Sequence, residues 1–253
     1  EQLKAWRDHY APRDKAFHEA KLSGKELVRW KFQRYAKNYL RCVKGVDESV
    51  DRLQKELKKL GLDNNTIVIY SSDQGFYIGD HGWYDKRWMY EESLKMPFIV
   101  KWPGVVKPGS RNTDLVQNLD YAQTFLEIAG APHPKDMQGL SLVPLLKGET
   151  TKDWRKEIYY HYYEYPSVHM IPRHYGIRTK RYKLMHFYQF GNEWEMYDLK
   201  VDPDELTNIY GNKETINLQK NLSNRLKKLR TYYEDGSDIS VRPDYIELYR
   251  KQS

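Results

Sequence analysis

The sequence predicts an α/β protein with a mainly parallel sheet, followed by a smaller antiparallel α+β part. Three observations lead to this fold class: one long helix with an apolar stripe, two apolar strand-like segments that alternate with helices, and a change to short aromatic segments after about residue 150. We therefore expect the α/β part to span residues 1–150 and the α+β part to span 151–253. A chain of 253 residues is long enough for this arrangement.

The N-terminal part is expected to contain a loop and then a long helix. The first residues are polar and mixed, and the segment 10–17 is typical of a loop. From about Glu26 to Leu60, apolar residues recur at steps of three and four, which predicts a helix with one apolar face. Gly61 provides the stop, because glycine readily adopts the left-handed conformation that ends many helices. We expect the apolar face to pack on the sheet.

Two strands and a second helix follow. Residues 66–70, TIVIY, are β-branched and apolar on both faces, which predicts a buried central strand of a parallel sheet. Residues 96–103, MPFIVKWP, predict a second strand. Asp120 is the expected N-cap of a helix, because Gln123 stands three residues later, and Gly130 is its expected end.

The last hundred residues predict a small antiparallel sheet with a C-terminal helix. Three aromatic segments are expected to be strands: residues 156–165, 176–188 and 194–199. RTKR, at 178–181, stands where a hairpin turn is needed. Leucines at helical spacing predict a final helix over 213–233.

Composition narrows the classes of partner. The 42 Lys and Arg exceed the 35 Asp and Glu by seven charges, but they are dispersed, so a nucleic-acid partner is not favoured. The excess suits an anionic substrate, and an ordinary solvated surface explains it equally well. The 22 tyrosines suit sugar-like ligands. No segment approaches the roughly 18 apolar residues of a membrane helix. Cys42 is the only cysteine, so no intrachain disulfide can form.

A dense polar cluster follows the strand at 66–70. Asp73 and Gln74 stand at its carboxyl end, where open α/β sheets bind ligands. Their side-chain oxygens are the type of ligand that Ca²⁺ or Mg²⁺ takes, but two ligands are too few, so others must come from distant sequence. By themselves these residues are more typical of an ordinary turn.

Two further residues of this cluster are candidates for catalysis. Lys86 could bind an anion as a point charge, and His81 could donate a hydrogen bond or transfer a proton. Either residue alone is more often an ordinary surface residue. Their occurrence within fourteen residues that start at Asp73 favours a functional site.

These segments carry a resemblance to a known family. Residues 63–104, DNNTIVIYSSDQGFYIGDHGWYDKRWMYEESLKMPFIVKWPG, resemble a characteristic block of the sulfatase family, within the alkaline-phosphatase-like superfamily. Residues 175–210, with the pattern MYDLKVDPDELTN, resemble the C-terminal subdomain of that family. Residues 34–62 are similar to the helix that leads into the block. The likeness extends over about residues 30–235 and implies an alkaline-phosphatase-like sandwich.

The resemblance also implies a mechanism. Sulfatases use a formylglycine, made from Cys or Ser in a C/S-x-P-x-R motif, and a Ca²⁺ ion that steadies the sulfate oxygens. By position, Asp73 and Gln74 match two metal ligands, with Gln74 where many relatives have Asn or His. Lys86 matches the lysine that contacts the sulfate and its leaving-group oxygen.

The nucleophile motif is missing. Cys42 has no Pro two residues on and no Arg four residues on, and neither Ser71 nor Ser72 fits the motif. We therefore expect the chain to be the C-terminal half of a sulfatase, inactive alone, with the N-terminal half of the same enzyme as its partner. The resemblance implies a periplasmic, secreted or lysosomal location.

The expected activity is hydrolysis of the sulfate ester of a sulfated glycan or an aryl sulfate. The segment HMIPRHYGIRT is expected to supply a substrate-facing loop with His169, Arg173 and His174, and an ordinary surface loop explains the segment equally well. Two alternatives remain open at this point. One is a phosphodiester or phosphonate ester hydrolase on the same scaffold, and the other is a non-catalytic glycan-binding fragment.

Overall fold

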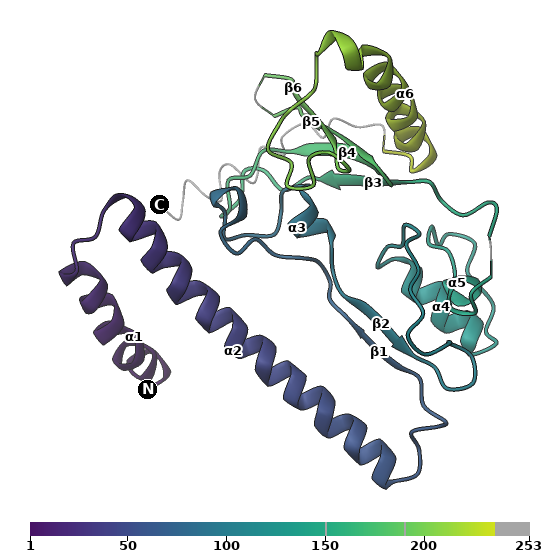
Figure 1. The fold of residues 1–253 in the computed structure, drawn as a ribbon, viewed down its shortest axis with the longest axis horizontal. Coiled ribbons are helices and arrows are strands. Elements are labelled where there is room, and N and C mark those ends of the chain that lie inside the picture. Colours follow the sequence, from purple (N-terminus) through teal and green to yellow (C-terminus); the bar gives the residue numbers. More distant parts are fainter. Residues whose placement is uncertain (150, 190, 236–253) are drawn as a thin grey trace. The chain divides into compact units, whose positions relative to one another are not determined.

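A computed structural model describes residues 1–149, 151–189 and 191–235 (Figure 1). The chain forms two compact units. The helical unit consists of residues 1–64 and 78–84, and the mixed unit consists of residues 65–77 and the residues from Asp85 on. The boundary expected near residue 150 does not separate these units, and it stays a prediction about the family's domains.

The helical unit begins with helix α1, Gln2–Glu19, where a loop was expected over 10–17. The expectation was wrong because Pro12, a residue that usually breaks helices, lies inside α1 without ending it. Leu3, Trp6 and Tyr10 follow the spacing of one helix face and were the signal that was missed.

Helix α2, Gly24–Lys59, confirms the predicted long helix. Its end is also as predicted: Gly61 has a φ of 69°, and the N–H of Leu62 donates to the carbonyl oxygen of Leu57 at 2.9 Å. No side chain of α2 is buried among the described residues, and its packing on a sheet stays a prediction. No helix in the described part of the chain has both the length and the hydropathy needed to cross a membrane.

The first strand of the mixed unit is β1, Val68–Ser71, and it pairs with β2, Phe98–Lys101. Both strands were predicted from the sequence, and the α/β class is confirmed. The pairing is antiparallel, however, with Val68 opposite Lys101, and β1 is half-buried. The apolar pattern identified the strand correctly, but it contains no information about the direction of the strand's neighbour.

Helix α4, Asp120–Ile128, starts where predicted, but its cap is different. Leu119 is the N-cap residue, and the buried carboxylate of Asp120 binds the guanidinium of Arg155, with 2.6 Å between Oδ1 and Nη2. The same carboxylate accepts the N–H of Gln117 at 2.8 Å. Two other short helices complete this part: α3, Glu91–Leu94, and α5, Val143–Leu146.

The C-terminal part confirms the predicted antiparallel sheet and helix. Four strands pair in chain order: β3, Glu157–Tyr162; β4, His174–Thr179; β5, Tyr182–Phe187; and β6, Glu193–Asp198. The predicted hairpin turn lies between β4 and β5. The short 3-10 helix η2, Lys213–Thr215, precedes α6, Ile216–Tyr232. Leu222 and Leu226 of α6 pack on Ile177 and Leu184 of the sheet.

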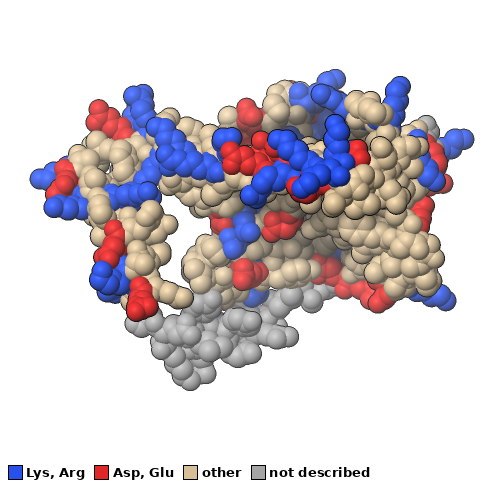
Figure 2. Space-filling view, turned by 90° about the horizontal axis from the view of Figure 1, so that it is seen from below, with Lys and Arg blue, Asp and Glu red and all other residues tan. Residues whose placement is uncertain are grey.

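Charged side chains of both signs occur together on the surface. On the face seen in Figure 2, Lys and Arg are interspersed with Asp and Glu. Helix α2 contributes ion pairs one turn apart, such as Lys44–Glu48 at 2.8 Å and Lys55–Asp51 at 2.7 Å. The dispersal expected from the sequence is therefore visible on this face.

Candidate active site

Asp73 and Gln74 directly follow the end of β1, as predicted. The hydroxyl of Ser72 donates to the carboxylate of Asp73 at 3.2 Å and to the carbonyl oxygen of Gln74 at 2.9 Å. The side-chain amide of Asn118 donates to the carbonyl oxygen of Asp73 at 3.4 Å. The Asp73 side chain is 79% exposed, so its oxygens are open to a ligand.

Lys86 points at Asp73. Its Nζ lies 3.8 Å from Oδ2 of Asp73, whereas the carboxylate of Asp85 pairs with Arg87. The ammonium of Lys86 therefore faces Asp73 and not the neighbouring Asp85. Its backbone is fixed by its own N–H, which donates to Asp85, and by its carbonyl oxygen, which accepts the hydroxyl of Ser93 at 2.6 Å.

Gly75 joins the strand end to helix α3 at very close range. Its N–H donates to the carbonyl oxygen of Ser93 at 2.7 Å. A Cβ atom at this position would lie 1.9 Å from the carbonyl oxygen of Glu92 and 2.5 Å from that of Lys95. Only glycine fits here, because the obstructing atoms belong to the backbone.

Tyr77 ties the same two segments together from inside. It is fully buried; its hydroxyl donates to the carbonyl oxygen of Trp88 at 3.0 Å and accepts the N–H of Tyr90 at 3.2 Å. Burial raises the pKa of Tyr77 well above its usual value, so the phenol keeps the proton that it donates. Residues 72–77 and 85–90, called the site loops below, are thus joined by the hydrogen bonds of Tyr77.

A cavity of about 710 Å³ opens beside Asp73 and Gln74. Asp73 and Gln74 line it together with Asn118, Tyr121 and Arg178. The cavity gives space for a ligand next to the two candidate metal ligands.

The other predicted catalytic residue, His81, belongs to the helical unit. It lies in the 3-10 helix η1, Asp80–Gly82, with a φ of 52°. The turn is supported by the carboxylate of Asp80, which accepts the N–H of Ile78 at 3.0 Å. A catalytic role of His81 stays a prediction.

Arg173 and His174, predicted to face the substrate, are buried. The guanidinium of Arg173 donates to the carbonyl oxygens of Tyr163, at 2.9 Å, and Tyr165. His174 is 0% exposed, and burial lowers its pKa to about 4. Both side chains are buried in this structure, and their predicted role in substrate binding stays a prediction. His169, in the same segment, is exposed.

The described residues do not form a metal centre by themselves. Among the residues that the structure describes, no group of three or more His, Cys, Asp or Glu could hold a metal ion. The carboxylate of Asp73 and the amide oxygen of Gln74 suit Ca²⁺ in chemistry, but Ca²⁺ takes about six to eight oxygen ligands. Cys42 is an exposed residue of α2.

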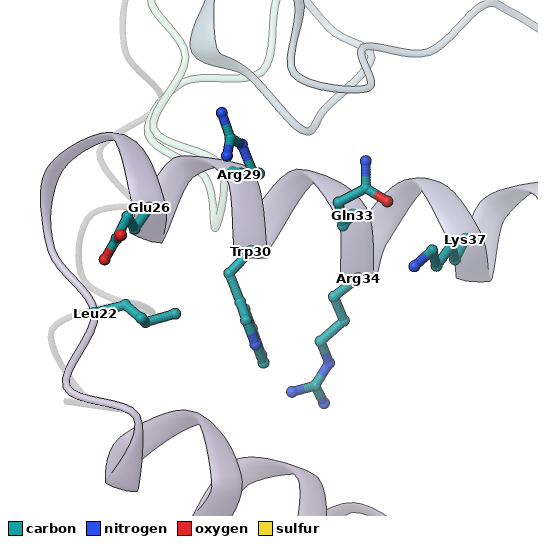
Figure 3. A pocket seen from close by; sticks show the side chains of 7 residues that line it. All are labelled: Leu22, Glu26, Arg29, Trp30, Gln33, Arg34 and Lys37. Atoms are coloured by element: carbon teal, nitrogen blue, oxygen red, sulfur yellow. The ribbon is translucent and has the colours of Figure 1, made fainter.

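A second cavity, of about 590 Å³, lies within the helical unit. Trp30 and Arg34 point from α2 toward α1 (Figure 3), and the guanidinium lies 5.2 Å from the centre of the indole ring. None of the predicted site residues lines this cavity.

Comparison with protein families decides the assignment. A family model described as "N-sulphoglucosamine sulphohydrolase, C-terminal" matches residues 79–232, and a model described as "Sulfatase" matches residues 6–131. The chain belongs to the sulfatase family.

Individual sulfatases show how close the likeness is. An N-acetylglucosamine-6-O-sulfatase of Bacteroides thetaiotaomicron is 49% identical over 233 residues, which cover 91% of this chain and 42% of the relative. A human N-acetylglucosamine-6-sulfatase is 40% identical over 119 residues, covering 46% of this chain and 21% of the relative. The chain thus spans less than half the length of these two relatives.

Solved structures agree with this family. One, of a protein in complex with its substrate D-glucosamine-2-N,6-O-disulfate, has a TM-score of 0.86 and 48% identity, and covers 92% of this chain and 47% of that one. A phosphonate monoester hydrolase of Agrobacterium radiobacter has a TM-score of 0.67 at 24% identity, covering 74% and 39%. The second likeness shows the fold alone.

Proposed function

We propose that the whole protein carrying this chain removes the 6-O-sulfate of glucosamine residues in a sulfated glycan. The observation that carries the proposal is the 49% identity to an N-acetylglucosamine-6-O-sulfatase over 91% of the chain. The match to a structure solved with a sulfated glucosamine supports the same substrate class. The accessible pair of Asp73 and Lys86 supports a site that handles an anion.

In this proposal Asp73 and Gln74 provide two of the oxygen ligands of a Ca²⁺ ion. The bound ion would supply a Lewis acid for the sulfate oxygens. The formylglycine nucleophile and the remaining ligands would come from the portion of the whole protein that corresponds to the relatives' other half. The hydroxyl of Ser72 contacts the carboxylate of Asp73 and the main-chain carbonyl oxygen of Gln74, which supports the turn that presents the two ligands.

Lys86 has the electrostatic role. As the ester S–O bond breaks, negative charge grows on the leaving sugar oxygen, and a fixed ammonium stabilises that charge more in the transition state than in the ground state. The hydroxyl of Ser93 fixes the Lys86 backbone, from which the side chain reaches Asp73. For His81, which belongs to the helical unit, we propose the role predicted from the sequence, donation of a hydrogen bond or transfer of a proton.

The test is a comparison of two ester classes with the whole protein. We expect release of inorganic sulfate from N-acetylglucosamine-6-sulfate and much slower cleavage of a phosphonate monoester of a similar leaving group. Preferential cleavage of the phosphonate ester would contradict the proposal and favour the alternative activity of this scaffold. Tight glycan binding without release of sulfate would favour a non-catalytic binding protein.

A further inference from the structure

Three segments that the sequence resemblance singled out meet at one buried point. Glu91 comes from the block EESLKMPF, Lys183 from RYKLMHF and Glu205 from DPDELTN. The Nζ of Lys183 lies 2.7 Å from Glu205 Oε1 and 3.1 Å from Glu91 Oε1. The three residues are 0–4% exposed. None of them has a part in the chemistry described above.

Further bonds complete this buried charge cluster. Arg178 donates to Glu91 twice, from Nη2 at 2.9 Å and from Nε at 3.2 Å. The second oxygen of Glu205 accepts the backbone N–H of Glu91 at 2.7 Å. Burial alone would raise the pKa of Glu91, but the hydrogen bond from Arg178 and the charge of Lys183 outweigh it and lower this pKa to about 2. Glu91 is therefore ionised.

Stability alone does not explain such a cluster. Burying charges costs desolvation energy, and apolar residues of similar volume are often as stable or more stable. The cluster does fix a geometry, because it holds both the side chain and the N–H of Glu91, the first residue of α3. A helix of four residues has almost no stability of its own, so its position depends on such contacts.

Helix α3 in turn holds both site loops. The carbonyl oxygen of Ser93 accepts the N–H of Gly75, and the hydroxyl of Ser93 donates to the carbonyl oxygen of Lys86. The chain of contacts thus runs from strand β5, through Lys183 and Glu91, to the residue after Gln74 and to Lys86.

We propose that Lys183 is a positioning residue, which, together with Glu205, locks α3 and thereby sets Gly75 and Lys86 in place. Lys183 does not touch the substrate in this account. The positioning of α3 by Lys183 does not depend on the proposed function. Only its kinetic consequence depends on sulfate hydrolysis.

Hydrogen exchange of the Gly75 amide in the whole protein tests the positioning of α3. We expect Lys183→Met to speed this exchange by roughly tenfold or more, because α3 no longer holds the acceptor in place. Arg181→Met is the matched control: Arg181, at the neighbouring hairpin turn, pairs with Asp198 at the surface, and its loss should leave the exchange unchanged. Unchanged Gly75 exchange in folded Lys183→Met would overturn the proposal.

A second variant covers the case in which Lys183→Met does not fold. Combining it with Glu205→Gln removes one positive and one negative charge together, so no buried carboxylate loses its cation without compensation. We expect this double variant to fold, with fast Gly75 exchange, a kcat lower by roughly tenfold and a KM within about twofold. Protection of Gly75 as in the wild type would overturn the positioning role, and wild-type kcat despite fast exchange would overturn its link to catalysis. Failure of the wild-type protein to release sulfate would count against the proposed function alone, since the exchange result stands without it.

Discussion

Two polar stretches of the mixed unit were predicted to carry site residues. Their side chains face opposite ways: those of one stretch point outward and those of the other point inward. In the site loops, the side chains of Asp73 and Lys86 face outward, whereas backbone groups and the buried Tyr77 hold the loops from the protein interior. In the segment before β4, Arg173 and His174 point inward, and Arg173 satisfies backbone carbonyls. Polar residue types identify both stretches. A polar side chain can meet a ligand only where other groups support the loop, and not where the side chain itself provides that support.

The largest effect should come from Gly75. Adding a Cβ in Gly75→Ala forces two backbone carbonyls apart, and we expect a loss of about 3 kcal/mol in the free energy of unfolding together with most of the activity. Gly45→Ala is the control, because its Cβ would meet nothing within 4 Å in the middle of α2 and should stabilise by about 0.5–1 kcal/mol. Urea unfolding measures both, and a Gly75→Ala protein as stable as the wild type would show that the loops are not locked.

Lys86 comes next. Lys86→Ala should lower kcat by roughly 10²-fold with a smaller change in KM, because the contact strengthens in the transition state. Lys101→Ala, at the exposed end of β2, is a control for loss of a surface cation and should leave both constants unchanged. Near-wild-type turnover of Lys86→Ala in steady-state assays would remove this residue from the site.

Arg173 tests the inward-facing stretch. Arg173→Met removes the guanidinium that donates to the carbonyl oxygens of Tyr163 and Tyr165, so we expect a loss of about 1–3 kcal/mol in stability. His169→Ala, at an exposed position of the same segment, should change stability by less than about 0.5 kcal/mol. A raised KM with unchanged Tm in Arg173→Met would instead restore Arg173 as a substrate-binding residue.

His174 makes stability depend on pH, an effect that is seen only below neutral pH. Its pKa is lowered to about 4 in the folded chain, so the unfolded chain, with an ordinary pKa near 6.5, binds the proton more readily. The contribution is complete above about pH 6.5 and falls by up to about 1.4 kcal/mol per pH unit toward pH 4. Urea midpoints at pH 7 and pH 5 should differ less in His174→Asn than in the wild type, and equal differences would contradict this account.

The elements of the fold that could be predicted are those that the local periodicity of the sequence specifies. The stripe of α2, the hairpin between β4 and β5 and the helix α6 all follow from spacing and turn residues. The pairing direction of β1 could not be predicted, because direction depends on a partner that local sequence does not encode. Asp120 was misassigned as a cap because its true partner, Arg155, lies 35 residues away.

For the candidate site, the sequence identified the outward-facing residues but not the framework behind them. Asp73, Gln74 and Lys86 belong to one recognisable block, and the structure brings Asp73 and Lys86 together. Lys183 was the available signal for the framework, since the alternation along β5 places it on the same face as the apolar residues Met185 and Phe187. Its partners, Glu91 and Glu205, lie far away in sequence, so only the structure identifies them.

The central claim is that the polar cluster at the end of β1 is the metal and sulfate part of a sulfatase site. The most direct measurement is sulfate release from N-acetylglucosamine-6-sulfate by the whole protein and by its Asp73→Ala variant, each with calcium and after chelation. We predict release by the calcium-loaded wild type, and at least roughly 10²-fold less after chelation or in Asp73→Ala, because removing a metal ligand removes the charge that stabilises the sulfate oxygens. Wild-type rates from Asp73→Ala, unaffected by chelation, would contradict the account.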